Sequence, residues 1–297
     1  MTPAPLAPQA CAAAVSAAVA DVFTVLEDWR DRVAAAVPLT TTTELDALVE
    51  TLVLPALLGE AEPAAHRDAA QHGTAQHGTA QHGTAQHGTA QQGTAQHGTA
   101  QHGTAPHGTA PHGAPALLVG AGFIATADYR PGRPAHFAWW LGPLASNPLL
   151  GTTLSPTRLD LAARVHTEYL RDFRGLEWYR VPEATGRAHV TGPYVDHLCT
   201  FDFIVTLTLP VQVDGGTVGV IGADVSVTRL EQALLPVLLG LSAPAALVNA
   251  VGRVMISTEA TLAAGDIVPN PGHPLTGYDR VPCPGIPFDV IVRRPPE

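Results

Sequence analysis

Aromatic side chains and one carboxylate are the residues whose types and spacing suggest chemistry in this chain. Trp178 and Tyr179 are neighbours, Tyr194 follows a Gly-Pro pair, and Asp224 lies near the end of an apolar run. Aromatic rings provide apolar walls with polar tips, and their faces attract ammonium groups. A carboxylate after an apolar run needs water, a hydrogen-bond donor or a ligand amine nearby. These residues predict a binding pocket.

Catalytic and metal motifs are absent from the sequence. No G-x-S-x-G elbow presents a serine nucleophile. His197 and Cys199 would point the same way on a strand, but no third group orients them. His189 and His197, with Asp196, lack the spacing of an HExxH-like metal site. We therefore expect no enzyme, no cofactor and no metal site, and a hydrolase that sequence does not reveal stays an alternative.

A hairpin must position Asp224. Ile204 to Pro210 alternates strictly, with valine and leucine on one face and Thr206 and Thr208 on the other. Asp214-Gly215 marks a reversal because glycine tolerates a positive φ. Thr217 to Val225 then returns as an apolar strand. The pattern predicts an antiparallel hairpin with one face against a core and one mildly polar face.

Two further strands are expected before this hairpin. Leu117 to Ile124 reads as a buried strand, with Gly120 and Gly122 as points of close approach. His136 to Leu141 reads as the next, and its two tryptophans must face opposite ways. Of the two, Trp140 is included in the candidate site.

Helices are expected around these strands. Residues 9–36 carry an apolar stripe at helical spacing, which fits either a dimerisation helix or a cover for the chain's own sheet. Thr41 and Glu44 are spaced as a capping box for a second helix, which Pro55 should end or kink. A helix over 159–178 would deliver Trp178-Tyr179 at its end. Thr228 and Glu231 predict a further capping box, starting a helix through Leu239.

The ordered set Trp178-Tyr179, Gly192 to Asp196, the threonine strand and Gly222-Ala223-Asp224 resembles the Cache superfamily of small-molecule sensor domains in its double form. The chain is also similar to soluble actinobacterial cache-domain proteins that accompany GntR-type regulators. The resemblance covers 117–294 and implies an α+β fold with a long N-terminal helix and two PAS-like antiparallel-sheet modules.

The resemblance also implies which residues contact a ligand. It adds Asp196 to a ligand-binding set of Trp178, Tyr179, Tyr194, Asp224 and Trp140. The arginine that grips a ligand carboxylate in the amino-acid-binding subset is missing, since Leu176 stands at its position. The ligand expected from the resemblance is therefore a small polar metabolite, an amine or an amino acid.

Residues 71–115 repeat QHGTA, with a histidine at nearly every fifth position. The glycines and the absence of large apolar residues favour a disordered linker. With a period of five residues, the histidines would not share one face of a helix, and they would not share one face of a strand. A His-rich metal-binding protein remains the alternative, because neutral imidazoles bind transition metals.

Composition limits the partners and the compartment. The net charge is −10, and every basic residue is an arginine. The strongly basic character of nucleic-acid-binding proteins is therefore absent. Residues 1–20 have no basic n-region, and no run of 18 strongly apolar residues suggests a membrane span. Cys11, Cys199 and Cys283 show no disulfide spacing, so we expect reduced thiols and a cytoplasmic location.

We divide the chain into N-terminal helices (1–60), the repeat linker (61–115), a ligand-binding module (116–240) and a smaller second module (241–297). No output segment is recognised in it, so a signal would pass to a separate protein, for which a GntR-type regulator is the candidate. A homodimer is compatible with the long first helix.

The repeat is expected to be an exposed insertion. Deleting residues 71–110 should leave the fold intact, because the entropic cost of a loop changes by only about 0.6 kcal/mol per doubling of its length. A thermal melt of the deletion variant should match the full chain within roughly 5 °C. A larger drop, or loss of soluble protein, would show that the repeat packs on the domain.

Overall fold

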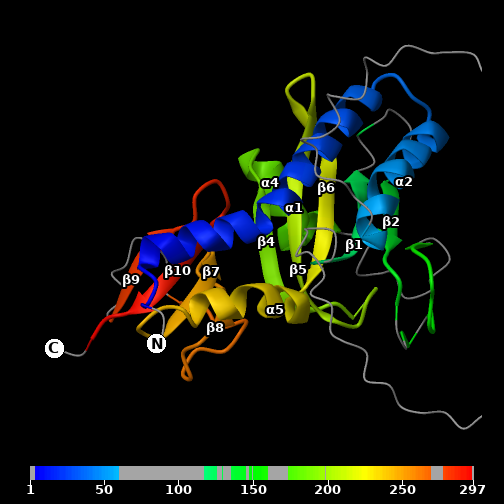
Figure 1. The fold of residues 1–297 in the computed structure, drawn as a ribbon. Coiled ribbons are helices and arrows are strands. Elements are labelled where there is room, and N and C mark those ends of the chain that lie inside the picture. Colours follow the sequence, from blue (N-terminus) through cyan, green and yellow to red (C-terminus); the bar gives the residue numbers. More distant parts are fainter. Residues whose placement is uncertain are drawn as a thin grey trace, which may run out of the picture. The chain divides into compact units, whose positions relative to one another are not determined.

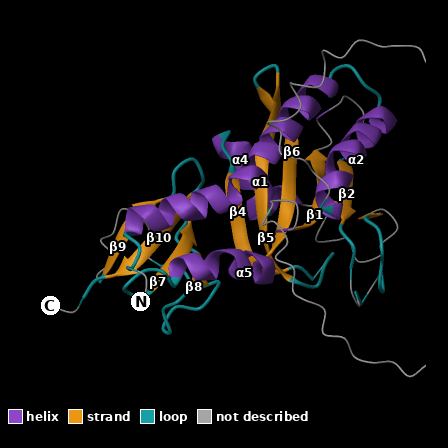
Figure 2. Cartoon of the chain, viewed as in Figure 1, coloured by secondary structure: helices purple, strands orange, loops and turns teal. Residues whose placement is uncertain are grey.

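The computed structural model describes residues 4–59, 117–125, 129, 135–144, 147–148, 150–159, 173–197, 199–268 and 277–295. The QHGTA repeat lies outside these residues, and so does 160–172 of the predicted helix. The described residues form two antiparallel sheets and four α-helices within one compact unit. The predicted α+β class, with a long N-terminal helix and two sheet modules, is confirmed (Figures 1 and 2).

The first sheet has six strands. Their order across the sheet is β3 (Thr157–Arg158), β2 (His136–Leu141), β1 (Leu118–Ala125), β6 (Gly216–Ser226), β5 (Phe203–Val213) and β4 (His189–Val195). β5 and β6 form the predicted hairpin, and Asp214 and Gly215 both have positive φ values, of 50° and 79°. The alternation of apolar and polar residues therefore identified the strand β5, and the Asp-Gly pair identified its turn.

The second sheet has four strands, in the order β8 (Val254–Ser257), β7 (Ala245–Asn249), β10 (Phe288–Arg293) and β9 (Tyr278–Pro282). Strand β9 carries no sequence signal of a strand, because YDRVP has no buried residue and no alternating apolar pattern.

Helix α5 (Val227–Leu238) connects the two sheets as expected, but its predicted capping box is wrong. The N-cap residue is Ser226, and it makes no capping hydrogen bond. Its hydroxyl donates instead to Asp202 Oδ2 at 3.1 Å. Thr228 already lies inside the first turn, so its spacing to Glu231 does not mark the helix start.

Helices α1 (Pro8–Ala36) and α2 (Thr42–Leu58) pack on one face of the first sheet. Val15, Val19 and Val22 of α1 share a core with the apolar face of β5. Phe23 meets Phe288 of β10 edge to face, with ring centroids 6.4 Å apart. One helix therefore packs against both sheets (Figure 1), which is the covering role considered for it.

The predicted capping box of Thr41 and Glu44 is present at the start of α2. Helix α2 continues three residues past Pro55, so this proline does not end it at once.

Helix α1 is long and apolar enough to cross a membrane by length and composition, contrary to the expectation from sequence. Core helices of soluble proteins and N-terminal signals pass the same test, and α1 buries its apolar stripe in the core.

The opposite face of the first sheet carries a 3-10 turn (Phe173–Gly175) and helix α4 (Glu177–Thr185). Trp178 and Tyr179 begin α4 and do not end the preceding segment, so the predicted placement at a helix end is wrong. Phe173 packs edge to face against Tyr179, with centroids 4.8 Å apart. This small aromatic cluster fixes α4 over β4, β5 and β6.

A buried amide forms a hydrogen-bonded link between the two sheets. Asn249, at the end of β7, is 0% exposed. Its Nδ2 donates to Val190 O at 2.9 Å and Gly192 O at 3.5 Å, both on β4. Its Oδ1 accepts from the backbone N–H groups of Val251 and Arg253, at 3.1 and 2.9 Å. The turn between β7 and β8 is thereby tied to a strand of the first sheet.

Replacing Asn249 with Ala should destabilise the fold by about 1–3 kcal/mol, because two buried carbonyls and two N–H groups lose their partner. Urea denaturation measures the change. Gln212→Ala, which removes an exposed amide, should change stability by less than about 0.5 kcal/mol. Equal stability of the two variants would contradict this role of Asn249.

Candidate ligand-binding cavity

One row of residues crosses five strands of the first sheet. In register, Leu141 on β2 faces Gly120 on β1, Gly120 faces Asp224 on β6, Asp224 faces Thr206 on β5, and Thr206 faces Thr191 on β4. Directly opposed residues on adjacent strands share a face of the sheet. Asp224 and the two threonines therefore stand side by side on the face that α4 covers in part.

Asp224 is held by a chain of two hydroxyl groups. Thr206 Oγ1 donates to Asp224 Oδ1 at 2.7 Å, and Tyr194 OH lies 2.6 Å from Thr206 Oγ1. Because Thr206 has one hydroxyl proton and gives it to Asp224, Tyr194 is the donor to Thr206. Tyr194 reaches this position because β4 shifts register between Thr191 and Tyr194, where Gly192 has a φ of 101°.

Burial sets the electrostatics of this chain. Asp224 is 5% exposed, and burial, followed by the charge of Asp196, raises its pKa from 3.8 to about 7, against the lowering effect of the Thr206 hydrogen bond. Burial also raises the pKa of Tyr194, with the charge of Asp224 as the next cause. A desolvated carboxylate of this kind gains strongly from a cation.

Glycines make room beside Asp224. A Cβ on Gly120 would lie 3.0 Å from both Asp224 Oδ2 and Trp139 Nε1. A Cβ on Gly122 would lie 2.1 Å from Ala138 O, which confirms the predicted close approach there. The indole of Trp139 therefore extends over β1, which carries no side chains at these points, next to the carboxylate.

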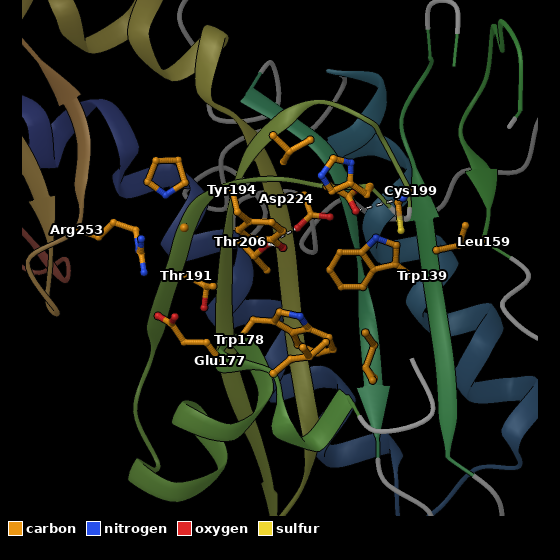
Figure 3. Close-up of a pocket in the computed structure, with 17 residues that line it drawn as sticks. Trp139, Leu159, Glu177, Trp178, Thr191, Tyr194, Cys199, Thr206, Asp224 and Arg253 are labelled. Carbon is orange, nitrogen blue, oxygen red and sulfur yellow. Dashed lines mark hydrogen bonds between the residues drawn. The ribbon is translucent and has the colours of Figure 1, made fainter. Parts of the chain in front are cut away.

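These groups face a cavity of about 780 Å³ (Figure 3). The volume lies in the range typical of small-molecule sites. Its walls combine aromatic and aliphatic side chains with a few polar groups. The aromatic residues are Trp139, Trp178 and Tyr194, and the polar or charged ones are Glu177, Thr191, Asp196, His197, Cys199, Thr206, Asp224 and Arg253.

Of the predicted ligand-binding residues, Trp178, Tyr194, Asp196 and Asp224 line this cavity. Tyr179 and Trp140 do not. Tyr179, in the first turn of α4, is 0% exposed and packs in the aromatic cluster between this helix and the sheet. Trp140 points to the opposite face of β2, into the core with the N-terminal helices, while the guanidinium of Arg158 lies 5.2 Å from its ring centroid.

Asp196 is occupied by its own loop. Its Oδ1 accepts from Cys199 N at 3.2 Å, and its Oδ2 accepts from Thr200 N at 2.7 Å and Thr200 Oγ1 at 3.0 Å. These bonds make it a structural element of the turn that follows β4. Toward a ligand it contributes negative charge near Asp224, and we assign it no hydrogen bond to the ligand.

Several lining residues were missed from the sequence. Strand alternation placed the two tryptophans on opposite faces, but only the packing of α1 and α2 shows that Trp139 faces the cavity. Thr206 was placed on the polar face without a role, although its pairing with Asp224 follows from the hairpin register. Thr191, Glu177 and Arg253 carry no signal in the sequence, because long-range packing brings them together.

A second group of charges lies at another part of the lining. His189 Nε2 is 2.9 Å from Glu177 Oε1. This hydrogen bond is the main cause that lowers the pKa of Glu177, and the nearby charge of Arg253 also contributes. Arg253 lies directly before β8, in the turn that Asn249 holds.

Metal ligands do not cluster in the described part of the chain. Among the described residues, no three His, Cys, Asp or Glu side chains gather as metal ligands. His197 and Cys199 both line the cavity, and no hydrogen bond between them is present in the described part of the chain.

A family model matches part of this chain. A family model described as methyl-accepting chemotaxis protein-like, first PDC sensor domain, matches residues 138–232. This segment contains most of β2 and all of the strands β4, β5 and β6 of the cavity. The match confirms the resemblance to a Cache-type, PAS-like sensor domain.

Solved ligand-binding domains of bacterial chemoreceptors are similar in structure. The domain of PctC from Pseudomonas aeruginosa is 15% identical, with 95% of this chain and 94% of that domain covered and a TM-score of 0.44. PctB from the same organism is 13% identical, with coverages of 96% and 91% and a TM-score of 0.47. CtaA from Pseudomonas fluorescens is 21% identical, with coverages of 42% and 61% and a TM-score of 0.31.

The raised pKa of Asp224 predicts a pH-dependent stability. Between pH 3.8 and about 7 the folded state holds a proton that the unfolded chain releases. The folded protein should therefore lose on the order of 4 kcal/mol, relative to an Asp224→Asn variant, as pH rises through this window. Urea unfolding of both proteins from pH 4 to 8 gives this difference, and a constant difference would contradict the buried, protonatable carboxylate.

Proposed function

We propose that this protein is a sensor that binds a small polar metabolite, an amine or an amino acid, in the cavity beside Asp224. The observation that carries the proposal is a buried carboxylate that faces a cavity walled by Trp139, Trp178 and Tyr194. A ligand ammonium there would meet one anion and several aromatic faces.

The energetics favour a cationic ligand group over a neutral one. A buried carboxylate without a cationic partner is costly in free energy. Thr206 donates one hydrogen bond to Asp224, and uptake of a proton reduces the remaining cost in the ligand-free protein. An ammonium group would stabilise the ionised form by charge-assisted hydrogen bonds and by attraction to the aromatic faces. Ligand binding would then displace the proton from Asp224.

We further propose a non-enzymatic role, in which occupancy of the cavity is passed to a separate partner. A GntR-type transcription regulator is the candidate partner, on the basis of the resemblance alone. Dimerisation through the exposed side of α1 is part of the same proposal. Co-purification from the native host and light scattering of the pure protein address the two points separately.

A cytoplasmic location is also proposed. Its support is the set of three cysteines, Cys11, Cys199 and Cys283, all of which are free thiols. The apolar character of α1 makes export or membrane attachment the competing outcome. Fractionation of cells that express the untagged chain separates the two: recovery in the membrane or periplasmic fraction would contradict the proposal.

A thermal-shift screen tests the ligand class. The panel contains L-amino acids, primary amines, purines and carboxylates. A true ligand at about 100 times its Kd adds about 2.7 kcal/mol to the stability of the folded state, and the melting temperature rises accordingly. We expect stabilisation by compounds that carry an ammonium group, and none by purines or simple carboxylates.

Asp224→Asn is the decisive variant for such a compound. The amide keeps the shape of the side chain but removes its charge, so affinity should fall by roughly ten- to a hundredfold, as expected for loss of a charge-assisted hydrogen bond. The ligand-free protein should be as stable as the parent at neutral pH, or more stable. Unchanged affinity together with a destabilised ligand-free protein would show that Asp224 has only a structural role.

A further inference from the structure

We propose that Arg253, which lies in the turn between β7 and β8 of the second sheet, forms the anion-binding end of the cavity, so that the ligand is a zwitterion whose ammonium meets Asp224 and whose carboxylate meets Arg253 and Thr191. This inference rests on the proposed function and deepens it. It names the class of ligand and gives the second sheet a direct part in recognition.

Arg253 is the one arginine among the described residues that line the cavity. Its side chain is partly buried, and its Nη1 donates to the carbonyl of Gly265 at 3.0 Å. That bond uses one of five N–H donors. Within the described part of the chain, no carboxylate lies within 4.0 Å of its guanidinium. The guanidinium of Arg253 is therefore positioned by the carbonyl of Gly265 and still has N–H groups that can donate to a ligand.

Thr191 gives an independent sign of a missing partner. It lines the cavity, its side chain is 7% exposed, and its Oγ1 has no hydrogen-bond partner among the described residues. A buried hydroxyl without a partner costs free energy comparable to a lost hydrogen bond. A ligand oxygen that accepts from this hydroxyl would remove that cost.

The backbone places Arg253 and Thr191 next to each other. Asn249 donates to the carbonyls of Val190 and Gly192, the residues on either side of Thr191. The same side chain accepts from the N–H of Arg253 at 2.9 Å. One amide therefore spans from the backbone of Arg253 to the backbone around Thr191.

The opposite charge lies across the sheet from this pair. Asp224 on β6 is separated from Thr191 by β5 alone, so two strand spacings, roughly 10 Å in total, divide their backbones. Figure 3 shows Arg253 entering from the side of Thr191 and Glu177, with Asp224 on the strand beyond Thr206. A ligand with one charge of each sign can lie between them.

Glu177 explains why the anion should be a ligand group. Its carboxylate is engaged by His189 at 2.9 Å and does not pair with Arg253, although the charge of Arg253 is close enough to lower its pKa. The negative charge of Glu177 also disfavours ligands with more than one anionic group. A monocarboxylate that also carries an ammonium is therefore the best match.

The test uses isothermal titration calorimetry of the full chain. The zwitterionic probes are several L-amino acids, glycine, and straight-chain amino acids of up to six carbons whose amine lies at the far end. Each probe is paired with the amine that lacks its carboxylate. Arg253→Gln should weaken the best zwitterion by roughly ten- to a hundredfold. The affinity for the matching amine should change by less than about twofold. Asp224→Asn should weaken both.

Two further variants control for structural damage. Arg253→Lys keeps the charge and should restore part of the affinity for the zwitterion. Arg229→Gln should leave every affinity unchanged, because Arg229 also donates to a backbone carbonyl, Leu118 O at 3.1 Å, but lies outside the cavity lining. Equal losses for zwitterion and amine in Arg253→Gln would mean that the variant damages the cavity and would overturn the inference.

The failure of this inference and the failure of the proposed function are distinguishable. If the parent protein binds amines as tightly as zwitterions, or if Arg253→Gln leaves zwitterion affinity unchanged, the role of Arg253 is overturned and the amine site at Asp224 stands. If no probe with an ammonium group binds, the proposed function itself is contradicted, and the role of Arg253 with it.

Discussion

The register of the β5–β6 hairpin is the constraint on which the site depends. It pairs Thr206 with Asp224 and directs both away from the core that α1 and α2 cover. A slip of one residue would turn the carboxylate into that core and bring Val205 or Ala223 to the cavity. The two-residue turn at Asp214-Gly215 and the apolar alternation of β5 together exclude such a slip.

The second sheet contributes to the cavity lining through the turn between β7 and β8. Asn249 ties its first turn to β4, and the same turn carries Arg253 to the cavity. Helix α1 packs against both sheets through Val15 to Phe23, so movement of one sheet must be accommodated by the other. A ligand that contacts Asp224 and Arg253 would bridge the two sheets, which gives a physical route from occupancy to a change of structure.

Sequence reasoning succeeded where local pattern decides structure and failed where distant packing does. The hairpin, the strand His136–Leu141 and the capping box at Thr41 follow from short-range rules, and all are present. The choice between Trp139 and Trp140 depends on which face the N-terminal helices cover, which alternation alone does not reveal. Arg253 is brought to the cavity by the turn after β7, and no local pattern marks such a contact. Asp224 was found because a carboxylate in an apolar strand is unusual by itself.

The central claim is that Asp224 is a buried carboxylate that exchanges its proton for a ligand cation. Carbon-13 NMR of the Asp224 carboxyl, assigned with Asp224→Asn, measures this directly across a pH titration. We expect a pKa of about 7 for Asp224 without ligand. In the presence of the compound that stabilises the protein most, this pKa should decrease by roughly 1 to 3. An ordinary carboxyl pKa without ligand, or the same titration with and without a bound compound, would contradict the account.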